Sequence, residues 1–121
     1  MSIPFVAVVD DDEALCSSLV ELMKSAGYRA EPFASAETFL VSPSLLRFDC
    51  IIADVYMPEK GGLELLQELH EQGIATPVIL ITGQPSSQLD EEAVSTGAYC
   101  LLTKPFEVSL LFDCIQRSTH H

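Results

Sequence analysis

Five short apolar runs, each followed by a segment with helical periodicity, constrain the fold of this chain more than any other feature of its sequence. The first run, residues 5–9, is apolar without alternation, which is typical of a strand covered on both faces in a parallel sheet. Similar runs occupy residues 50–53, 77–81 and 100–102, and a more polar run at 28–33 is expected nearer the sheet edge. The intervening segments carry apolar residues at three- and four-residue spacing, which predicts amphipathic helices.

Capping residues indicate where these helices begin and end. Side chains that can cap a helix N-terminus precede three of the predicted helices: Asp12, Ser35, and either Ser86 or Ser87. Glycines that can end a helix follow three of them: Gly27, Gly73 and Gly97. The last helix is expected to end by about Ser118 and to place four side chains inward: Phe106, Leu110, Cys114 and Ile115. One helix after each strand, with right-handed crossovers, predicts an α/β fold. We expect a flavodoxin-like, doubly wound (βα)5 domain with a parallel five-stranded sheet in the order 2-1-3-4-5.

Polar residues follow four of the predicted strands at the point where each strand ends: Asp10 and Asp11, Asp54, Thr82, and Lys104. In a parallel sheet these positions meet at one edge. Three crowded carboxylates need a cation or raised pKa values, and their hard oxygen atoms suit Mg²⁺ better than a soft metal. An ammonium and a hydroxyl opposite them would complete a pocket for a tetrahedral anion, and a carboxylate can act as a covalent nucleophile. The pattern therefore predicts a phosphoryl-accepting site.

Ordered motifs carry a resemblance to a known family: Val8-Val9-Asp10-Asp11-Asp12-Glu13, Asp54-Val55-Tyr56-Met57-Pro58 with Gly62-Leu63-Glu64, Ile81-Thr82-Gly83, and Gly97-Ala98 leading to Lys104-Pro105-Phe106. With them, residues 5–116 resemble a response-regulator receiver domain of two-component signalling, similar to the chemotaxis regulators, and we expect residues 1–118 to form that domain. The resemblance implies that Asp54 accepts a phosphoryl group from the phosphohistidine of a sensor histidine kinase. It also implies that Asp11, Asp54 and the backbone carbonyl of Tyr56 hold Mg²⁺, with Asp10 in support through water. Lys104 and Thr82 would contact the phosphoryl oxygens.

The residues around Asp54 and Gly62 are most similar to receivers that precede a LuxR-type helix-turn-helix, which implies a transcriptional output domain outside this chain. Phosphorylation would switch the face of the fourth helix, fifth strand and fifth helix, and could promote a homodimer through it. Such a domain is a signalling switch and not an enzyme, although it assists its own phosphorylation and the hydrolysis of its acyl phosphate. The bulky Tyr56 is expected to shield that acyl phosphate from water and slow its loss.

One residue departs from the family pattern. Leu101 lies three residues before Lys104, where receivers usually have Tyr or Phe coupled to a shift of Thr82. Tyr99 is aromatic but lies two residues earlier, and we interpret it as a surface residue.

Charge and composition limit the partners and the compartment. Eighteen acidic residues against six basic ones give a formal net charge of −12, which disfavours direct nucleic acid binding by this segment. No apolar run approaches the roughly 18 residues of a membrane span, and four cysteines without a CxxC pair resemble small buried hydrophobes. These features predict a cytoplasmic protein that does not enter the membrane. His120 and His121 resemble the start of a purification tag, so residues 119–121 are expected to be a tag or a disordered end, and His70 is expected to lie solvated on a helix.

Two other functions remain open from the residues alone. Asp10-x-Asp12 with Thr82 and Lys104 loosely resembles a phosphatase of the haloacid-dehalogenase type, in which Asp10 would be the nucleophile. A pseudo-receiver that only docks partners is the second alternative. Each motif alone also has a plainer interpretation: the acidic triplet as a solvated helix cap, Thr82 as a strand-end residue that bonds its own backbone, and Lys104-Pro105 as a turn.

Overall fold

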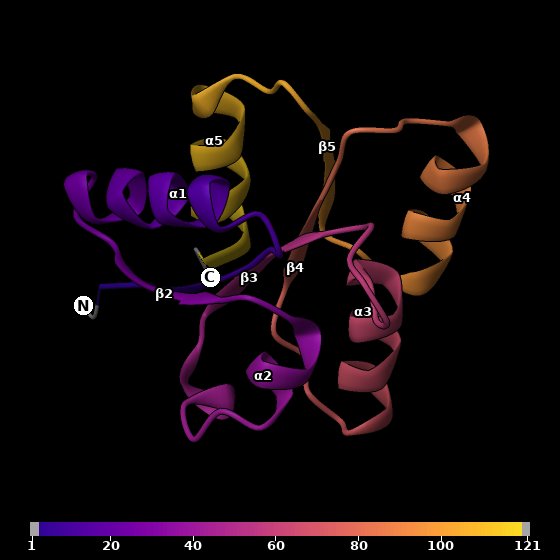
Figure 1. Cartoon of the computed structure of the whole chain (residues 1–121), viewed down its shortest axis with the longest axis horizontal. Helices are drawn as coiled ribbons and strands as arrows, with labels where there is room; N and C mark the ends of the chain where they lie inside the picture. The colour runs from indigo at the N-terminus through magenta and orange to yellow at the C-terminus, as the bar shows by residue number, and fades with distance from the viewer. Residues whose placement is uncertain (1–2, 120–121) are drawn as a thin grey trace.

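The computed structural model describes residues 3–119 and contains all five predicted strands and helices in the predicted order (Figure 1). The strands are β1 (Phe5–Val9), β2 (Arg29–Phe33), β3 (Cys50–Asp54), β4 (Val78–Thr82) and β5 (Cys100–Thr103). The helices are α1 (Glu13–Ser25), α2 (Ala36–Leu40), α3 (Gly62–Glu71), α4 (Ser87–Thr96) and α5 (Val108–Thr119), and a short 3-10 helix, Leu45–Arg47, precedes β3.

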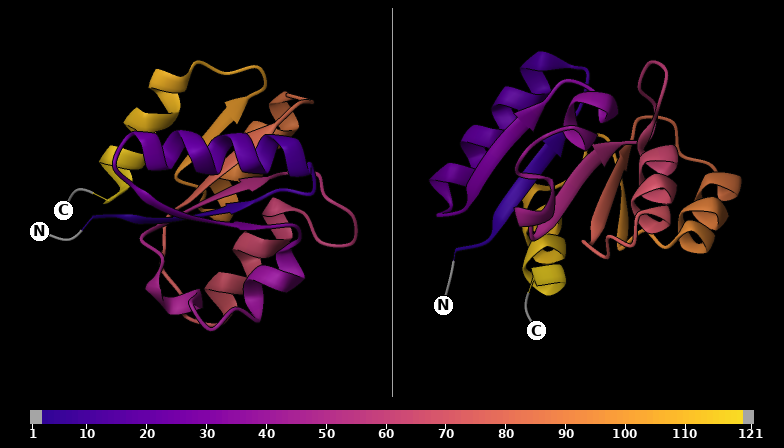
Figure 2. Two further views of the ribbon diagram at one scale, coloured as in Figure 1. Left: turned by 60° about the vertical axis from the view of Figure 1, so that its left-hand side comes forward. Right: turned by 90° about the horizontal axis from the view of Figure 1, so that it is seen from below.

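All four strand pairings are parallel, and the strand order is β2-β1-β3-β4-β5. Helices α1 and α5 cover one face of the sheet, and α2, α3 and α4 cover the other (Figure 2). Consecutive residues of a strand point to opposite faces of the sheet. Ile51 packs in the hydrophobic core under α2, α3 and α4, and Ile52 packs in the core under α1 and α5. The flavodoxin-like doubly wound prediction is therefore confirmed.

The predicted capping residues are also confirmed. The Asp12 side chain accepts a hydrogen bond from the Leu15 N–H at 3.1 Å, and Ser86 caps α4 through the Leu89 N–H at 3.0 Å. Gly97 ends α4 in the left-handed region with φ of +95°, a conformation that glycine adopts without a Cβ clash.

The structure corrects one prediction about α5. Leu110 was expected to face inward, but it is 50% exposed, whereas Leu111 is fully buried. The helix begins at Val108, so Phe106 lies outside its periodicity, and the buried face is set by Leu111, Cys114, Ile115 and Ser118. The helix continues through Thr119, one residue past the expected end; His120 and His121, the rest of the expected tag or disordered end, lie outside the described residues. No helix within residues 3–119 has the length and apolar character needed to cross a membrane.

Candidate functional site

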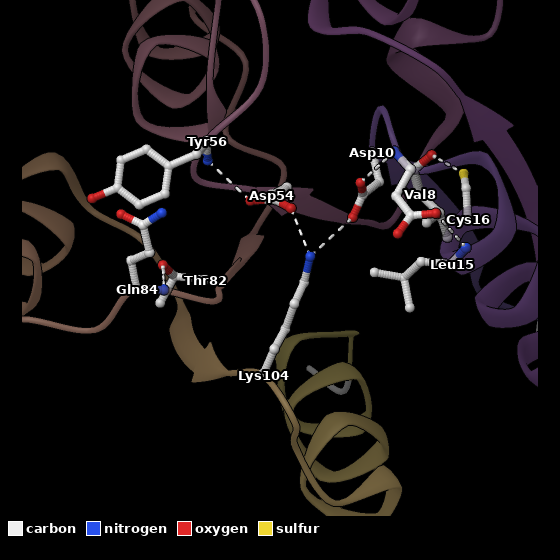
Figure 3. Close-up of polar contacts among 10 residues, drawn as sticks. Val8, Asp10, Leu15, Cys16, Asp54, Tyr56, Thr82, Gln84 and Lys104 are labelled. Carbon is white, nitrogen blue, oxygen red and sulfur yellow. Dashed lines mark hydrogen bonds and ion pairs between the residues drawn. The ribbon is translucent and has the colours of Figure 1, made fainter.

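The carboxyl ends of four strands bring the predicted site residues to one edge of the sheet (Figure 3). Asp10 follows β1, Asp54 ends β3, Thr82 ends β4 and Lys104 follows β5. Asp10, Asp54 and Thr82 are buried, with exposed fractions of 3%, 8% and 0%. Burying a carboxylate is costly unless an opposite charge or hydrogen bonds compensate it, so this edge of the sheet requires positive charge.

Lys104 supplies part of that compensation. Its ammonium nitrogen lies 2.7 Å from Oδ2 of Asp54 and 3.7 Å from Oδ2 of Asp10, so one cation pairs with acids from two strands. Burial opposes the charge on Lys104, but the hydrogen bond to Asp54 and the negative charges of Asp10 and Asp54 outweigh it and raise the pKa of the ammonium. Lys104 is therefore protonated at neutral pH.

The carboxylates of Asp10, Asp11 and Asp54 form a cluster in which one oxygen of each lies within 4.8 Å of the others. Burial is the main cause that raises the pKa of Asp10; the N–H of Asp12 and the Lys104 charge lower it, and the charges of Asp54 and Asp11 raise it again. Lys104 alone therefore does not neutralise the cluster. A set of hard, anionic oxygen atoms at this spacing can hold a divalent cation.

Backbone groups orient the two buried acids. The Tyr56 N–H donates to Oδ1 of Asp54 and the Asp12 N–H to Oδ1 of Asp10, both at 2.9 Å. With Oδ1 bound to the backbone and Oδ2 to Lys104, both oxygens of Asp54 are fixed in position. Tyr56 is 53% exposed, and its ring extends from the backbone away from the Asp54 carboxylate (Figure 3).

Thr82 lies at the same edge, but its hydroxyl bonds within its own loop. Oγ1 accepts from the Gln84 N–H at 3.0 Å, and the Thr82 carbonyl accepts from the Lys104 N–H at 2.7 Å. This arrangement matches the interpretation of Thr82 as a residue at the end of a strand whose side chain bonds the neighbouring backbone. The backbone bond to Lys104 nevertheless connects Thr82 directly to the residue that pairs with Asp54.

Two glycines contribute to the site in a way that the sequence alone did not reveal. A Cβ built on Gly62 would lie 2.7 Å from the carbonyl oxygen of Asp54, and one on Gly61 would collide with the carbonyl oxygen of Val55. Both positions require a residue without a Cβ, because each lies directly against the backbone at the end of β3.

The remaining residues singled out in the sequence lie away from the acidic cluster. Leu101 is partly buried against the α2–α3–α4 side core, while Tyr99 is 43% exposed, which confirms its interpretation as a surface residue. His70 is exposed on α3, as expected. The structure thus gathers Asp10, Asp11, Asp54 and Lys104, with Thr82 adjacent.

Comparison with known proteins agrees with this fold and site. The family model of the response regulator receiver domain matches residues 6–116. The response regulator protein TmoT of Ectopseudomonas mendocina is 37% identical over 111 residues, which are 92% of this chain and 50% of TmoT. The transcriptional regulatory protein FixJ of Azorhizobium caulinodans is 39% identical over 113 residues, 93% of this chain and 54% of FixJ. The chemotaxis protein CheY4 of Vibrio cholerae superposes with a TM-score of 0.88 at 30% identity, covering 97% of this chain and 99% of CheY4.

The chain belongs to the response regulator receiver domain family. Members of this family are phosphoacceptors of two-component signalling, are phosphorylated on aspartate, and are signalling domains rather than metabolic enzymes. The chain spans about half the length of the curated relatives that it matches. Family membership leaves the haloacid-dehalogenase-type phosphatase, with Asp10 as its nucleophile, without support.

Proposed function

We propose that Asp54 is the phosphoacceptor of this receiver, which acts in the cytoplasm and takes its phosphoryl group from the phosphohistidine of a sensor histidine kinase. The observation that supports this assignment best is the 2.7 Å contact between the Lys104 ammonium and Oδ2 of Asp54. A carboxylate fixed at a strand end beside a cation can receive an anionic group whose charge that cation offsets.

The three clustered carboxylates fit a hard divalent cation, and we assign Mg²⁺ to Asp11 and Asp54, with the backbone carbonyl of Tyr56 as a further ligand and Asp10 in support through water. Bound there, Mg²⁺ would offset the negative charge of the phosphoryl oxygens during transfer. The fit rests on the donor set: hard oxygen atoms, anionic and incompletely neutralised by Lys104.

In the transfer, a carboxylate oxygen of Asp54 bonds to phosphorus while the bond from phosphorus to the donor imidazole nitrogen breaks. Lys104 keeps its proton and turns from the carboxylate toward a phosphoryl oxygen, and the Thr82 hydroxyl leaves the Gln84 N–H to donate to another. The Thr82 shift is transmitted to β5 because the Thr82 carbonyl accepts from the Lys104 N–H. Water later attacks the acyl phosphate at the same site, so the domain assists its own dephosphorylation.

The response to phosphorylation is a change in the face formed by α4, β5 and α5, which regulates a transcriptional output domain. Val94, Tyr99 and Leu110 give this face exposed apolar surface, which supports its use as a contact surface and as the interface of a phosphorylation-dependent homodimer. With a net charge of −12, direct nucleic acid binding is left to another part of the protein.

The decisive experiment is intact-mass measurement after incubation with acetyl phosphate and Mg²⁺. The wild-type chain is expected to gain one phosphoryl group, and Asp54→Asn to gain none. Asp90→Asn, which makes the same acid-to-amide change at an exposed position on α4, is the matched control and should be phosphorylated like the wild type. An equal adduct on Asp54→Asn would refute the assignment, and no adduct on either chain would favour a pseudo-receiver.

A further inference from the structure

The connection from β3 to α3, residues 55–61, starts directly after Asp54 and folds back on itself. At its start, the Tyr56 N–H donates to Oδ1 of Asp54 at 2.9 Å. Just past its end, the Gly62 N–H donates to the Val55 carbonyl at 3.2 Å, so the two ends of the connection lie side by side. The orientation of the Asp54 carboxylate therefore depends on how firmly this connection is held.

A strained turn lies in the middle of the connection. The Lys60 N–H donates to the Pro58 carbonyl at 2.8 Å, which closes a tight three-residue turn. Glu59 at its centre has φ of +68°, in the left-handed region that is unfavourable for a residue with a Cβ. Backbone of this kind persists only where the surrounding contacts hold it in place. The ion pair between Lys60 and Glu68 of α3 is one such contact.

A second contact takes the place of a conventional helix cap. Gly61 is the N-cap residue of α3, and a serine or aspartate could not replace it, because a Cβ there would collide with the Val55 carbonyl oxygen. Glu64, three residues further on, reaches back instead, and its Oε1 accepts from the Gly61 N–H at 2.9 Å. Glu64 is exposed, yet it connects the end of the strained connection to the first turn of α3.

We propose that Glu64 is a positioning residue for the phosphorylation of Asp54, an inference that rests on the function proposed above. Its carboxylate holds the connection in the strained conformation, and the connection in turn keeps the Tyr56 N–H on Oδ1 of Asp54. Without this acceptor, the Gly61 N–H is released and the turn at Glu59 can relax. The Tyr56 N–H then leaves Asp54 more often, and the carboxylate loses its fixed orientation.

Two measurements on matched variants test this role. Glu64→Ala removes the acceptor, and we expect the Tyr56 amide to exchange its hydrogen about five- to tenfold faster in EDTA, measured by NMR. Phosphorylation by acetyl phosphate and Mg²⁺ should slow by a similar factor, about five- to tenfold. Glu64→Gln keeps an oxygen for the Gly61 N–H and should restore both rates to within about twofold of the wild type. Ser35→Ala is the control, because it removes the cap of α2, where Ser35 accepts from the Thr38 N–H at 3.1 Å, and should change neither rate.

Unchanged exchange at Tyr56 in Glu64→Ala would overturn the proposal, as would faster exchange with an unchanged phosphorylation rate. If Glu64→Gln behaved like Glu64→Ala, the negative charge near the helix N-terminus would be the cause, and the hydrogen-bond role would fail. Glu64→Ser, whose side chain is also too short to reach, replaces the alanine variant if that variant does not fold. A wild-type chain that accepts no phosphoryl group would refute the proposed function itself, and this outcome is distinct because amide exchange requires no phosphoryl transfer.

Discussion

At the scale of single residues, the site stores electrostatic repulsion that a ligand can relieve. Asp10 is buried beside Asp54 and Asp11, and among residues 3–119 the Lys104 ammonium is the one cation that pairs with the two buried acids. The charges that would make the site bind a cation therefore destabilise the fold while no cation is present. Function and stability oppose each other at these positions.

Replacing Asp10 with asparagine should consequently stabilise the metal-free protein. The asparagine side chain would keep an oxygen for the Asp12 N–H, and Lys104 would keep Asp54 as its partner, so the change mainly removes a repelled charge. We expect the free energy of unfolding to increase by about 1 kcal/mol at neutral pH. Urea unfolding in EDTA measures it, with Asp90→Asn as the exposed control.

The pH dependence gives a second check of the same variant. Because the folded-state pKa of Asp10 lies above its ordinary value of 3.8, protonation favours the folded state. The stability gap between Asp10→Asn and the wild type should be largest above the raised pKa. It should shrink as the pH falls through that value and close below about 3.8. A gap independent of pH would show that packing, and not charge, causes it.

Tyr56 is the residue most directly placed to affect the lifetime of an acyl phosphate on Asp54. Its N–H donates to Oδ1 of Asp54, and the residue is 53% exposed. A ring that hinders water should slow hydrolysis, so Tyr56→Ala is expected to lose its phosphoryl group several-fold faster, roughly two- to tenfold. The decay of the phosphorylated mass in Mg²⁺ buffer measures this rate. Tyr99→Ala is the control, because it removes an exposed aromatic residue just before β5, at the end of that strand away from the site. It should leave the decay rate unchanged.

At the scale of elements, the connection from β3 to α3 holds the end of β3 in place. Gly61 and Gly62 lie directly against the backbone of Asp54 and Val55, and Lys60 pairs with Glu68 of α3. Since Asp54 is the last residue of β3, a disturbance of this connection would reach it through the main chain.

Gly62→Ala should therefore destabilise the protein. The added Cβ would meet the Asp54 carbonyl oxygen and a Leu80 methyl, both at 2.7 Å, and neither the backbone nor the core can yield freely. We expect a loss of about 1–3 kcal/mol in the free energy of unfolding, as for other overpacked positions. Gly83→Ala is the matched control, because its Cβ would meet nothing within 4 Å. Equal stability of the two variants would contradict the close-approach interpretation of Gly62.

The elements themselves follow closely from local sequence signals. Apolar runs without alternation located the strands, and Asp12, Ser86 and Gly97 located helix ends, because both signals act within a few residues. The inward face of α5 was less predictable: the sequence contains both Leu110 and Leu111, and only the helix start at Val108 decides which one the sheet buries. The parallel topology in turn placed Asp10, Asp54 and Lys104 together. It could not supply the hydrogen bond between the Thr82 hydroxyl and the Gln84 N–H, which depends on side-chain packing.

At the scale of the whole molecule, the net charge of −12 creates repulsion that any added salt screens. A specific Mg²⁺ effect must therefore exceed the general effect of ionic strength. Monovalent salt should raise the melting temperature modestly and to a similar degree in the wild type and in site variants.

Mg²⁺ should raise the melting temperature more than NaCl of the same ionic strength does. The reason is that a cation that binds the folded chain but not the unfolded chain shifts the unfolding equilibrium toward the folded state. At about ten times its Kd, the gain in stability should be about 1.4 kcal/mol. Asp11→Asn, which removes an exposed member of the cluster, should lose most of this additional gain while keeping the response to NaCl. EDTA should return the wild type to its metal-free melting temperature. If Asp11→Asn and the wild type gained equally from Mg²⁺, the cation would be acting on the acidic surface as a whole, and the assignment of Asp11 as a ligand would fail.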